Sequence, residues 1–385
     1  MQNFTFCNPT KIIFGKGTIG ALKREVPAGK KIMLIYGGGS IKRNGTYDEI
    51  MAALEGREVY EFSGVEANPT YETLMKCVEQ VKAKGVDFLL AAGGGSVIDG
   101  TKFVAAAALF DGDPWKILQT YGSCVKEALP FASVLTLPAT GSEMNSGSVI
   151  TRVSIKAKLP FNSKLVFPMF SVLDPQKTYT LPANQVANGV VDAFVHVAEQ
   201  YLTIPAHAKI QDRFAEGILA TLIEEGPVAL KDPENYEVRA NIMWAATMAL
   251  NGLIGAGVPQ DWSTHMIGHE LTALYGLDHA VTLAIVLPGI LTLRKEHKRE
   301  KLLQFAQRIW GIKSGNEDYQ IAEGIQKTRE FFQSMGIKTC LSDYNIDSAG
   351  IDKVVAQLKS HQMIKLGEHG DITPDVARQA LELCL

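Results

Sequence analysis

Histidine and aspartate side chains gather in two short apolar stretches of the sequence. Asp192 and His196 stand four residues apart, His265 and His269 repeat that spacing, and His279 follows soon afterwards. Residues four apart project from the same face of a helix. Burying a carboxylate among several imidazoles is costly unless these groups pair with one another or bind a cation. The pattern therefore predicts a site for one divalent metal ion.

The spacing alone leaves the set of ligands open. Asp192 and His196 could instead form a hydrogen-bonded pair within one helix. The spacing also does not decide whether His265, His269 or both bind the metal. The zincin motif HExxH is absent, because Glu270 follows the second histidine. Imidazole and carboxylate ligands suit Fe²⁺ or Zn²⁺ and do not identify the metal.

Two glycine-rich turns point to a second kind of chemistry. Residues 37–40 and residues 93–96 both read Gly-Gly-Gly-Ser, and each turn lies between a short apolar run and a helical pattern. Glycine lets the backbone approach a ligand, and the start of the next helix offers free N–H groups to phosphate. The repeat predicts a site for a dinucleotide. Neither turn is GxGxxG, and the alternative is that both are only tight turns.

The first glycine turn also predicts the form of the cofactor. NAD-selective sites commonly place an acidic side chain near the adenosine ribose, but the first acidic residue after this turn is Asp48. Glycines leave room for a 2′-phosphate, and a nearby hydroxyl and ammonium group could bind it. The alternative is that Lys42 and Arg43 form a solvated helix start. We therefore predict NADP(H), bound in this turn by Gly37, Gly38, Gly39, Ser40 and Lys42.

The elements that must position these residues differ between the two halves of the chain. Short runs that are apolar on both faces predict buried parallel strands, at residues 32–36, 88–92, 134–137 and 171–173. Helical patterns alternate with them, at residues 71–84 and 97–110. This alternation is typical of a doubly wound α/β domain. A third turn, Pro138 to Glu143, follows one of the strands and could line the same sheet edge or simply cap a helix.

After Pro182 the strand patterns stop and only helical spacings remain. The sequence therefore predicts an α/β dinucleotide-binding domain over residues 1–181 and an all-helical metal and substrate domain over residues 182–385. The expected helices lie at residues 184–201, 211–225, 236–253, 264–274, 298–309, 321–335, 351–358 and 374–383.

Composition excludes several classes of function. The chain has 38 Lys and Arg against 41 Asp and Glu, so its charge of −3 does not favour nucleic acid or anionic lipid as a partner. Five cysteines without a CxxC pair predict reduced thiols in the cytoplasm. Residues 240–260 lack ionisable side chains but contain Asn241, Asn251 and Gln260, so a buried helix is expected there rather than a membrane span. No secretory signal is expected at the N-terminus.

Taken together, the motifs resemble those of a known family. GGGS, GGGSVID, PATGSE, DAFVH and HMIGHELTALYGLDHA occur in this order. They resemble the iron-containing (group III) alcohol dehydrogenases, and most of all the NADPH-dependent butanol dehydrogenase and aldehyde reductase branch. The resemblance spans essentially the whole chain. It implies a Rossmann-like domain followed by a helical metal domain, in an architecture similar to that of dehydroquinate synthase, and oligomer base rates favour a homodimer.

The resemblance also implies roles for individual residues. The metal ligands would be Asp192, His196, His265 and His279. His269 would face the cleft between the two domains without binding the metal, as a proton relay or as a neighbour that only supports the ligands. The pyrophosphate and nicotinamide would contact Gly94, Gly95, Ser96 and Asp99, the rest of the cofactor would contact Thr136, Thr140, Asn145 and Lys158, and the adenosine would contact Asn68.

We therefore predict a metal-dependent dehydrogenase that uses NADP(H) and reduces a short- to medium-chain, uncharged aldehyde to its primary alcohol. The metal would polarise the carbonyl and the nicotinamide would deliver the hydride. A lyase of the dehydroquinate synthase type would need basic residues around a phosphorylated acid, whereas the predicted ligands lie in apolar sequence. A non-catalytic binding protein is the third alternative. Oxidation of NADPH in the presence of butanal separates the three.

Overall fold

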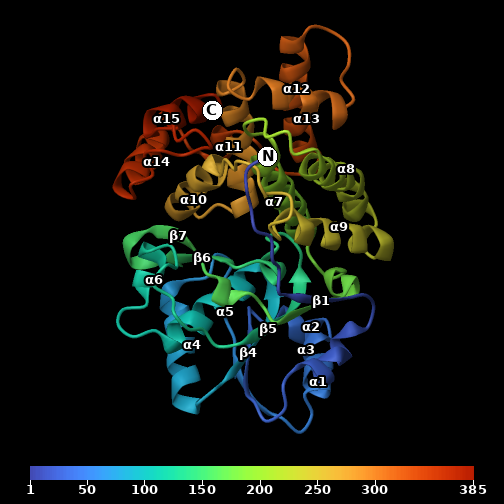
Figure 1. Cartoon of the computed structure of the whole chain (residues 1–385), viewed down its shortest axis with the longest axis vertical. Helices are drawn as coiled ribbons and strands as arrows, with labels where there is room; N and C mark the ends of the chain where they lie inside the picture. Colours follow the sequence, from blue (N-terminus) through green and yellow to red (C-terminus); the bar gives the residue numbers. More distant parts are fainter. The chain divides into compact units, whose positions relative to one another are not determined.

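The computed structural model describes residues 1–385, which divide into two compact units (Figure 1). The sheet unit comprises residues 7–181 and 233–247, and the helical unit comprises residues 1–6, 182–232 and 248–385. Most of helix α9 (Tyr236–Ala249) therefore belongs to the sheet unit, although residues 182–232 before it and 248–385 after it belong to the helical unit.

The sheet unit is built on six parallel strands in the order β1-β8-β5-β4-β2-β3. In chain order the strands are β1 (Lys11–Phe14), β2 (Lys31–Tyr36), β3 (Glu58–Phe62), β4 (Phe88–Gly94), β5 (Phe131–Leu137) and β8 (Phe170–Leu173). The parallel α/β fold expected from the sequence is confirmed. The two edge strands, β1 and β3, were not predicted, because β1 is short and only partly buried and β3 is interrupted by glutamates.

Alternate residues of the inner strands enter two different cores. Met33 and Ile35 of β2 pack on one face of the sheet, and Ile32 and Leu34 pack on the other. The first face is covered by α4 (Tyr71–Lys84), α5 (Gly95–Leu109) and α6 (Trp115–Gln119), and the second by α1 (Leu22–Glu25), α2 (Ser40–Arg43) and α3 (Thr46–Ala53) (Figure 1). A strand with helices on both sides must be apolar on both sides, which is the pattern seen in the sequence.

The strand order places a topological switch point between β2 and β4. The chain leaves β2 toward β3 on one side, whereas it leaves β4 toward β5 on the other. Open α/β sheets bind ligands outside the carboxyl ends of the strands at such a point. The two Gly-Gly-Gly-Ser turns, residues 37–40 and 93–96, lie at the ends of these two neighbouring strands.

A two-stranded antiparallel sheet, which the sequence patterns did not predict, packs on α5. It consists of β6 (Gly147–Arg152) and β7 (Ala157–Asn162). The Ser148 hydroxyl donates to the Asp99 carbonyl, and the Val149 N–H donates to the Asp99 carboxylate at 2.9 Å. These bonds fix the hairpin, which carries Lys158, to the helix that begins at the second glycine turn.

The helical unit contains no strand, in agreement with the expected all-helical half. Its helices are α7 (Ala183–Tyr201), α8 (Lys209–Lys231), α10 (Ser263–Tyr275), α11 (His279–Leu293), α12 (Arg299–Arg308), α13 (Glu317–Ser334), α14 (Ser348–Ser360) and α15 (Pro374–Glu382). Helix α7 packs against α8 and α11, and α10 packs against α11. None of the helices in the structure combines the length and the apolar character that crossing a membrane requires.

Candidate active site

Helix α7 carries three polar side chains into the interior of the helical unit. Every residue of α7 from Gly189 to Tyr201 is buried. Asp192, His196 and Glu199 follow one another at spacings of four and three, so their side chains share one face of the helix. Two carboxylates and an imidazole are therefore removed from water together, which requires compensation by hydrogen bonds or by a cation.

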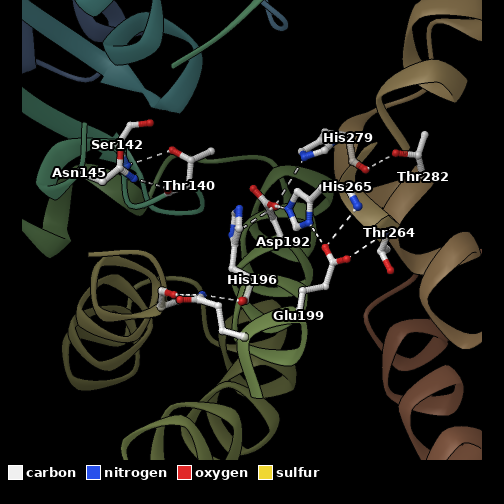
Figure 2. Close-up of polar contacts among 12 residues, drawn as sticks. Thr140, Ser142, Asn145, Asp192, His196, Glu199, Thr264, His265, His279 and Thr282 are labelled. Carbon is white, nitrogen blue, oxygen red and sulfur yellow. Dashed lines mark hydrogen bonds and ion pairs between the residues drawn. The ribbon is translucent and has the colours of Figure 1, made fainter. Parts of the chain in front are cut away.

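Helices α10 and α11 bring two more histidines to this face of α7. His265 lies in the first turn of α10, and His279 is the first residue of α11. Ligand atoms of Asp192, His265 and His279 all lie within 4.8 Å of one another. Figure 2 shows the Asp192 carboxylate among the rings of these residues and of His196. The structure thus brings together all four residues predicted to bind metal.

The distances within this cluster fit one shared ion better than direct hydrogen bonds. Asp192 Oδ1 lies 3.5 Å from His196 Nδ1, 3.8 Å from His265 Nε2 and 3.9 Å from His279 Nε2. These separations exceed normal N–H···O distances. Ligands about 2.1 Å from a tetrahedral ion stand about 3.4 Å apart. His196 Nδ1 and His265 Nε2 are buried without a hydrogen-bond partner, so the donor set fits a divalent metal.

The electrostatics of His196 and His265 agree with a cation site. Burial lowers the pKa of His196 to about 4, so this ring is neutral at pH 7 and keeps a lone pair for a metal. Burial also disfavours charge on His265, but the carboxylates of Glu199 and Asp192 outweigh it and raise the pKa of His265 to about 9. This ring therefore lies in a strongly anionic environment, which a bound cation would neutralise.

His269 lies beside the cluster, one helical turn after His265. Its side chain is buried, and its ring centroid is 5.1 Å from that of His279 and 6.4 Å from that of His265. Neither His269 nor His196 is among the three residues whose ligand atoms all lie within 4.8 Å of one another, but His196 Nδ1 lies 3.5 Å from Asp192 Oδ1. This placement agrees with its expected position next to the ligands, while its role as a proton relay stays a prediction.

Glu199 is the residue of the cluster that the sequence interpretation missed. Its carboxylate forms a short hydrogen bond with His265 Nδ1 and accepts a 2.6 Å hydrogen bond from the Thr264 N–H (Figure 2). A signal was present, because Glu199 continues the helical spacing of Asp192 and His196. Its partner lies 66 residues away in the sequence, however, and no local pattern announces that contact.

The second glycine turn, at the end of β4, is closely packed against the end of β5. A Cβ atom on Gly95 would lie 2.4 Å from the Thr140 hydroxyl, and one on Gly94 would lie 2.9 Å from Leu137 Cβ. Only glycine at these positions lets the second glycine turn approach the turn that follows β5 so closely. Gly95 and Ser96 also begin α5, a full helix of 15 residues whose first N–H groups can bind phosphate.

The residues around this turn are joined by hydrogen bonds. Lys158 Nζ donates to Asn68 Oδ1 at 2.8 Å, and the Asn68 N–H donates to the Ser96 hydroxyl at 3.3 Å. The Asn145 amide donates to the Thr140 carbonyl (Figure 2), and its Oδ1 accepts from the buried ammonium of Lys102 at 2.8 Å. Two other predicted contacts, Thr136 on β5 and Asp99 on α5, are buried, and Asp99 accepts hydrogen bonds from Ser142 and Val149.

The first glycine turn differs from the second in two respects. Helix α2, which follows it, has only four residues, so it offers a much weaker dipole than α5. In addition, Lys42 Nζ lies 3.2 Å from Glu61 Oε2, while the hydroxyls of Tyr36 and Tyr47 also donate to this carboxylate. The sequence interpretation noted no acidic residue near this turn, because Glu61 comes from the neighbouring strand β3.

Comparisons with known proteins identify the family of the chain. The family model described as "Iron-containing alcohol dehydrogenase" matches residues 9–175, and the model of the C-terminal part of the same family matches residues 186–375. The chain is 58% identical over 384 residues to the "NADPH-dependent aldehyde reductase YqhD" of Escherichia coli, covering 99% of both chains. It is 46% identical to a "Probable NADH-dependent butanol dehydrogenase 1" of Bacillus subtilis, covering 92% of both.

Solved structures show the same similarity in three dimensions. The crystal structure of E. coli YqhD superposes with a TM-score of 0.99 at 57% identity, covering 100% of this chain and 99% of the other. The NADH-dependent butanol dehydrogenase A of Thermotoga maritima superposes with a TM-score of 0.95 at 37% identity, again over 100% and 99% of the two chains. The predicted fold and family resemblance are both confirmed.

Proposed function

The chain belongs to the iron-containing alcohol dehydrogenase family and is an oxidoreductase of that type, and from this premise we propose that it reduces uncharged aldehydes to primary alcohols with NADPH. The observation that carries the proposal is the convergence of three histidine rings on one oxygen of Asp192. The turns at the ends of β2, β4 and β5 would hold the cofactor. The metal would be Fe²⁺ or Zn²⁺.

The residues of the chain bind and orient the two reactants. Asp192, His196, His265 and His279 would hold the ion beside the substrate carbonyl. When bound, the ion supplies a Lewis acid for the carbonyl, and NADPH supplies the hydride. The first turn of α5, with Gly94, Gly95 and Ser96, would bind the pyrophosphate, and Lys158 and Asn68 would lie beside it. His269 would donate the proton that the alkoxide product needs.

Charge around the metal site predicts the class of aldehyde. Asp192 and Glu199 are the carboxylates in contact with the histidine cluster, and both pair with histidine rings. The ion would balance their charge, so a carboxylate on the substrate would have to leave water without a basic partner of its own, at a cost of at least about 1.4 kcal/mol or roughly tenfold in kcat/KM. Metal-loaded protein should therefore oxidise NADPH faster with butanal than with succinic semialdehyde. Metal-stripped protein is the control, and a preference for the acid would contradict this assignment of substrate.

Cofactor selectivity is the second point at which the proposal can be tested in detail. The relatives include both NADPH- and NADH-dependent enzymes by name, so selectivity must come from local residues. Gly38 is exposed at the first turn, and a Cβ atom there would meet nothing within 4 Å, whereas Gly39 has a φ of +89° that strains any side chain. Gly38 is therefore the position at which an acidic group can be introduced with least disturbance.

We expect Gly38→Asp to lower the preference for NADPH over NADH. The new carboxylate would repel the 2′-phosphate and could accept a hydrogen bond from the 2′-hydroxyl of NADH. Loss of a charge-assisted contact worth ~1.5–3 kcal/mol should reduce the ratio of the two kcat/KM values by roughly tenfold to a hundredfold. Gly38→Asn is the matched uncharged control. An unchanged ratio in Gly38→Asp, or a wild-type preference for NADH, would refute this placement of the 2′-phosphate.

A further inference from the structure

We propose that Glu199 is the positioning residue of the metal centre, because its carboxylate holds the His265 ring with Nε2 facing Asp192 and the ion. This inference rests on the metal site proposed above and adds a residue that is not itself a ligand. Three donors converge on the carboxylate of Glu199: His265 Nδ1, the N–H of Thr264 at 2.6 Å and the N–H of His265 at 3.2 Å. The whole side chain is buried.

The contact with Nδ1 decides which nitrogen of His265 can bind metal. A carboxylate accepts hydrogen bonds but cannot donate one, so Nδ1 must carry the proton of the ring. Nε2 is then the nitrogen that gives up its proton when a metal binds, and it is this atom that lies 3.8 Å from Asp192 Oδ1 without a hydrogen-bond partner. Metal-binding histidines commonly use their other ring nitrogen in this way, which fixes the tautomer and the orientation of the ring.

The same carboxylate also caps the helix that carries the ligand. The N-cap residue of helix α10 is Trp262, which has a left-handed backbone. Its side chain makes no capping hydrogen bond. The exposed N–H groups of a helix start favour a negative charge nearby. Glu199 of α7 supplies that charge, so it holds the backbone and the ring of His265 at the same time and ties α10 to α7.

A buried ion-pair network holds the segment behind this contact. The Asp261 N–H donates to the Glu199 carbonyl, and the Asp261 carboxylate accepts from the Ser263 N–H and lies 2.9 Å from Lys298 Nζ. Lys298 in turn lies 2.6 Å from Glu368 and donates to the Leu202 carbonyl. Asp261, at the entry to α10, is therefore bonded to the Glu199 backbone, to the start of α10 and to Lys298. These contacts hold the start of α10, and with it His265, close to Glu199.

The proposal predicts a specific consequence of Glu199→Gln. A glutamine oxygen can still accept from the Thr264 N–H, but its amide group then turns a donor toward His265 Nδ1. The ring would have to move its proton to Nε2, where it would block the metal. Loss of such a partner typically weakens metal binding about 10- to 100-fold.

The experiment measures Zn²⁺ affinity of metal-stripped full-length protein by competition with a chromogenic chelator, so activity is not the readout. Glu216→Gln is the matched control, because Glu216 is also a buried glutamate, accepts from Tyr201 and pairs with Arg213, and contacts no predicted ligand. We expect a Kd raised about 10- to 100-fold in Glu199→Gln and unchanged in Glu216→Gln. An unchanged Kd in Glu199→Gln, or an equal rise in both variants, would overturn the proposal.

A measurement on the wild-type protein keeps the proposal testable if a variant does not fold. Ring ¹⁵N shifts of the Zn²⁺-loaded protein should show His265 protonated at Nδ1 and metal-bound at Nε2, and the opposite tautomer would overturn the role of Glu199. If wild-type protein fails to bind Zn²⁺, the proposed metal site itself is wrong. If it binds Zn²⁺ but the variant binds equally well, only the role of Glu199 is wrong.

Discussion

Replacing His279 by alanine should remove the metal and lower kcat with NADPH and butanal by about 10³-fold or more. A Lewis acid at the carbonyl contributes several kcal/mol of stabilisation in the transition state, and about 4 kcal/mol corresponds to this factor. Among the predicted ligands, His279 is the best position for the test. Its side chain is 22% exposed, against 5 to 6% for Asp192, His196 and His265, so its removal leaves a smaller cavity than removal of either of the other two histidines.

The measurement combines metal analysis of the purified protein, thermal unfolding and steady-state kinetics. His297→Ala is the matched control, because His297 is exposed and is not one of the predicted ligands. Its metal content and kcat should equal those of the wild type. Full turnover by metal-free His279→Ala protein would end the metal-dependent mechanism, while retention of the metal with full occupancy would show that His279 is not a ligand.

The buried part of the sheet could be predicted because its sequence is constrained on both faces. The run from Ile32 to Tyr36 is apolar throughout, since alternate residues pack into the two cores. Edge strand β3 contains Glu58 and Glu61 and borders solvent, so its sequence lacks this pattern. Helix α11 was missed for the opposite reason. It is buried nearly all round and contains Pro288, so no apolar face alternates with a polar one.

Candidate ligands could be predicted where a helix carries two groups at its own repeat. Local spacing selected Asp192 and His196 on α7 and the two histidines of α10 as candidates, and only the family resemblance favoured His265 over His269. Contacts between elements could not be predicted in this way. Glu199 reaches His265 only because the fold brings the start of α10 to α7, and Glu61 reaches Lys42 only because β2 and β3 are neighbours.

Replacing His269 by alanine should leave the metal in place and lower kcat by about 10²-fold, the usual contribution of a general acid or base. The imidazole of His269 is buried, and its ring centroid lies 5.1 Å from that of His279. Its nitrogens are not among the ligand atoms that converge around Asp192.

His269→Gln is the informative second variant, because glutamine keeps a hydrogen-bond donor of similar reach but cannot release and regain a proton. A relay predicts that both variants are slow and both retain the metal. A purely structural role predicts that glutamine restores turnover. If metal content falls with either substitution, His269 is itself a ligand, and the division of roles along α10 between His265 and His269 is wrong.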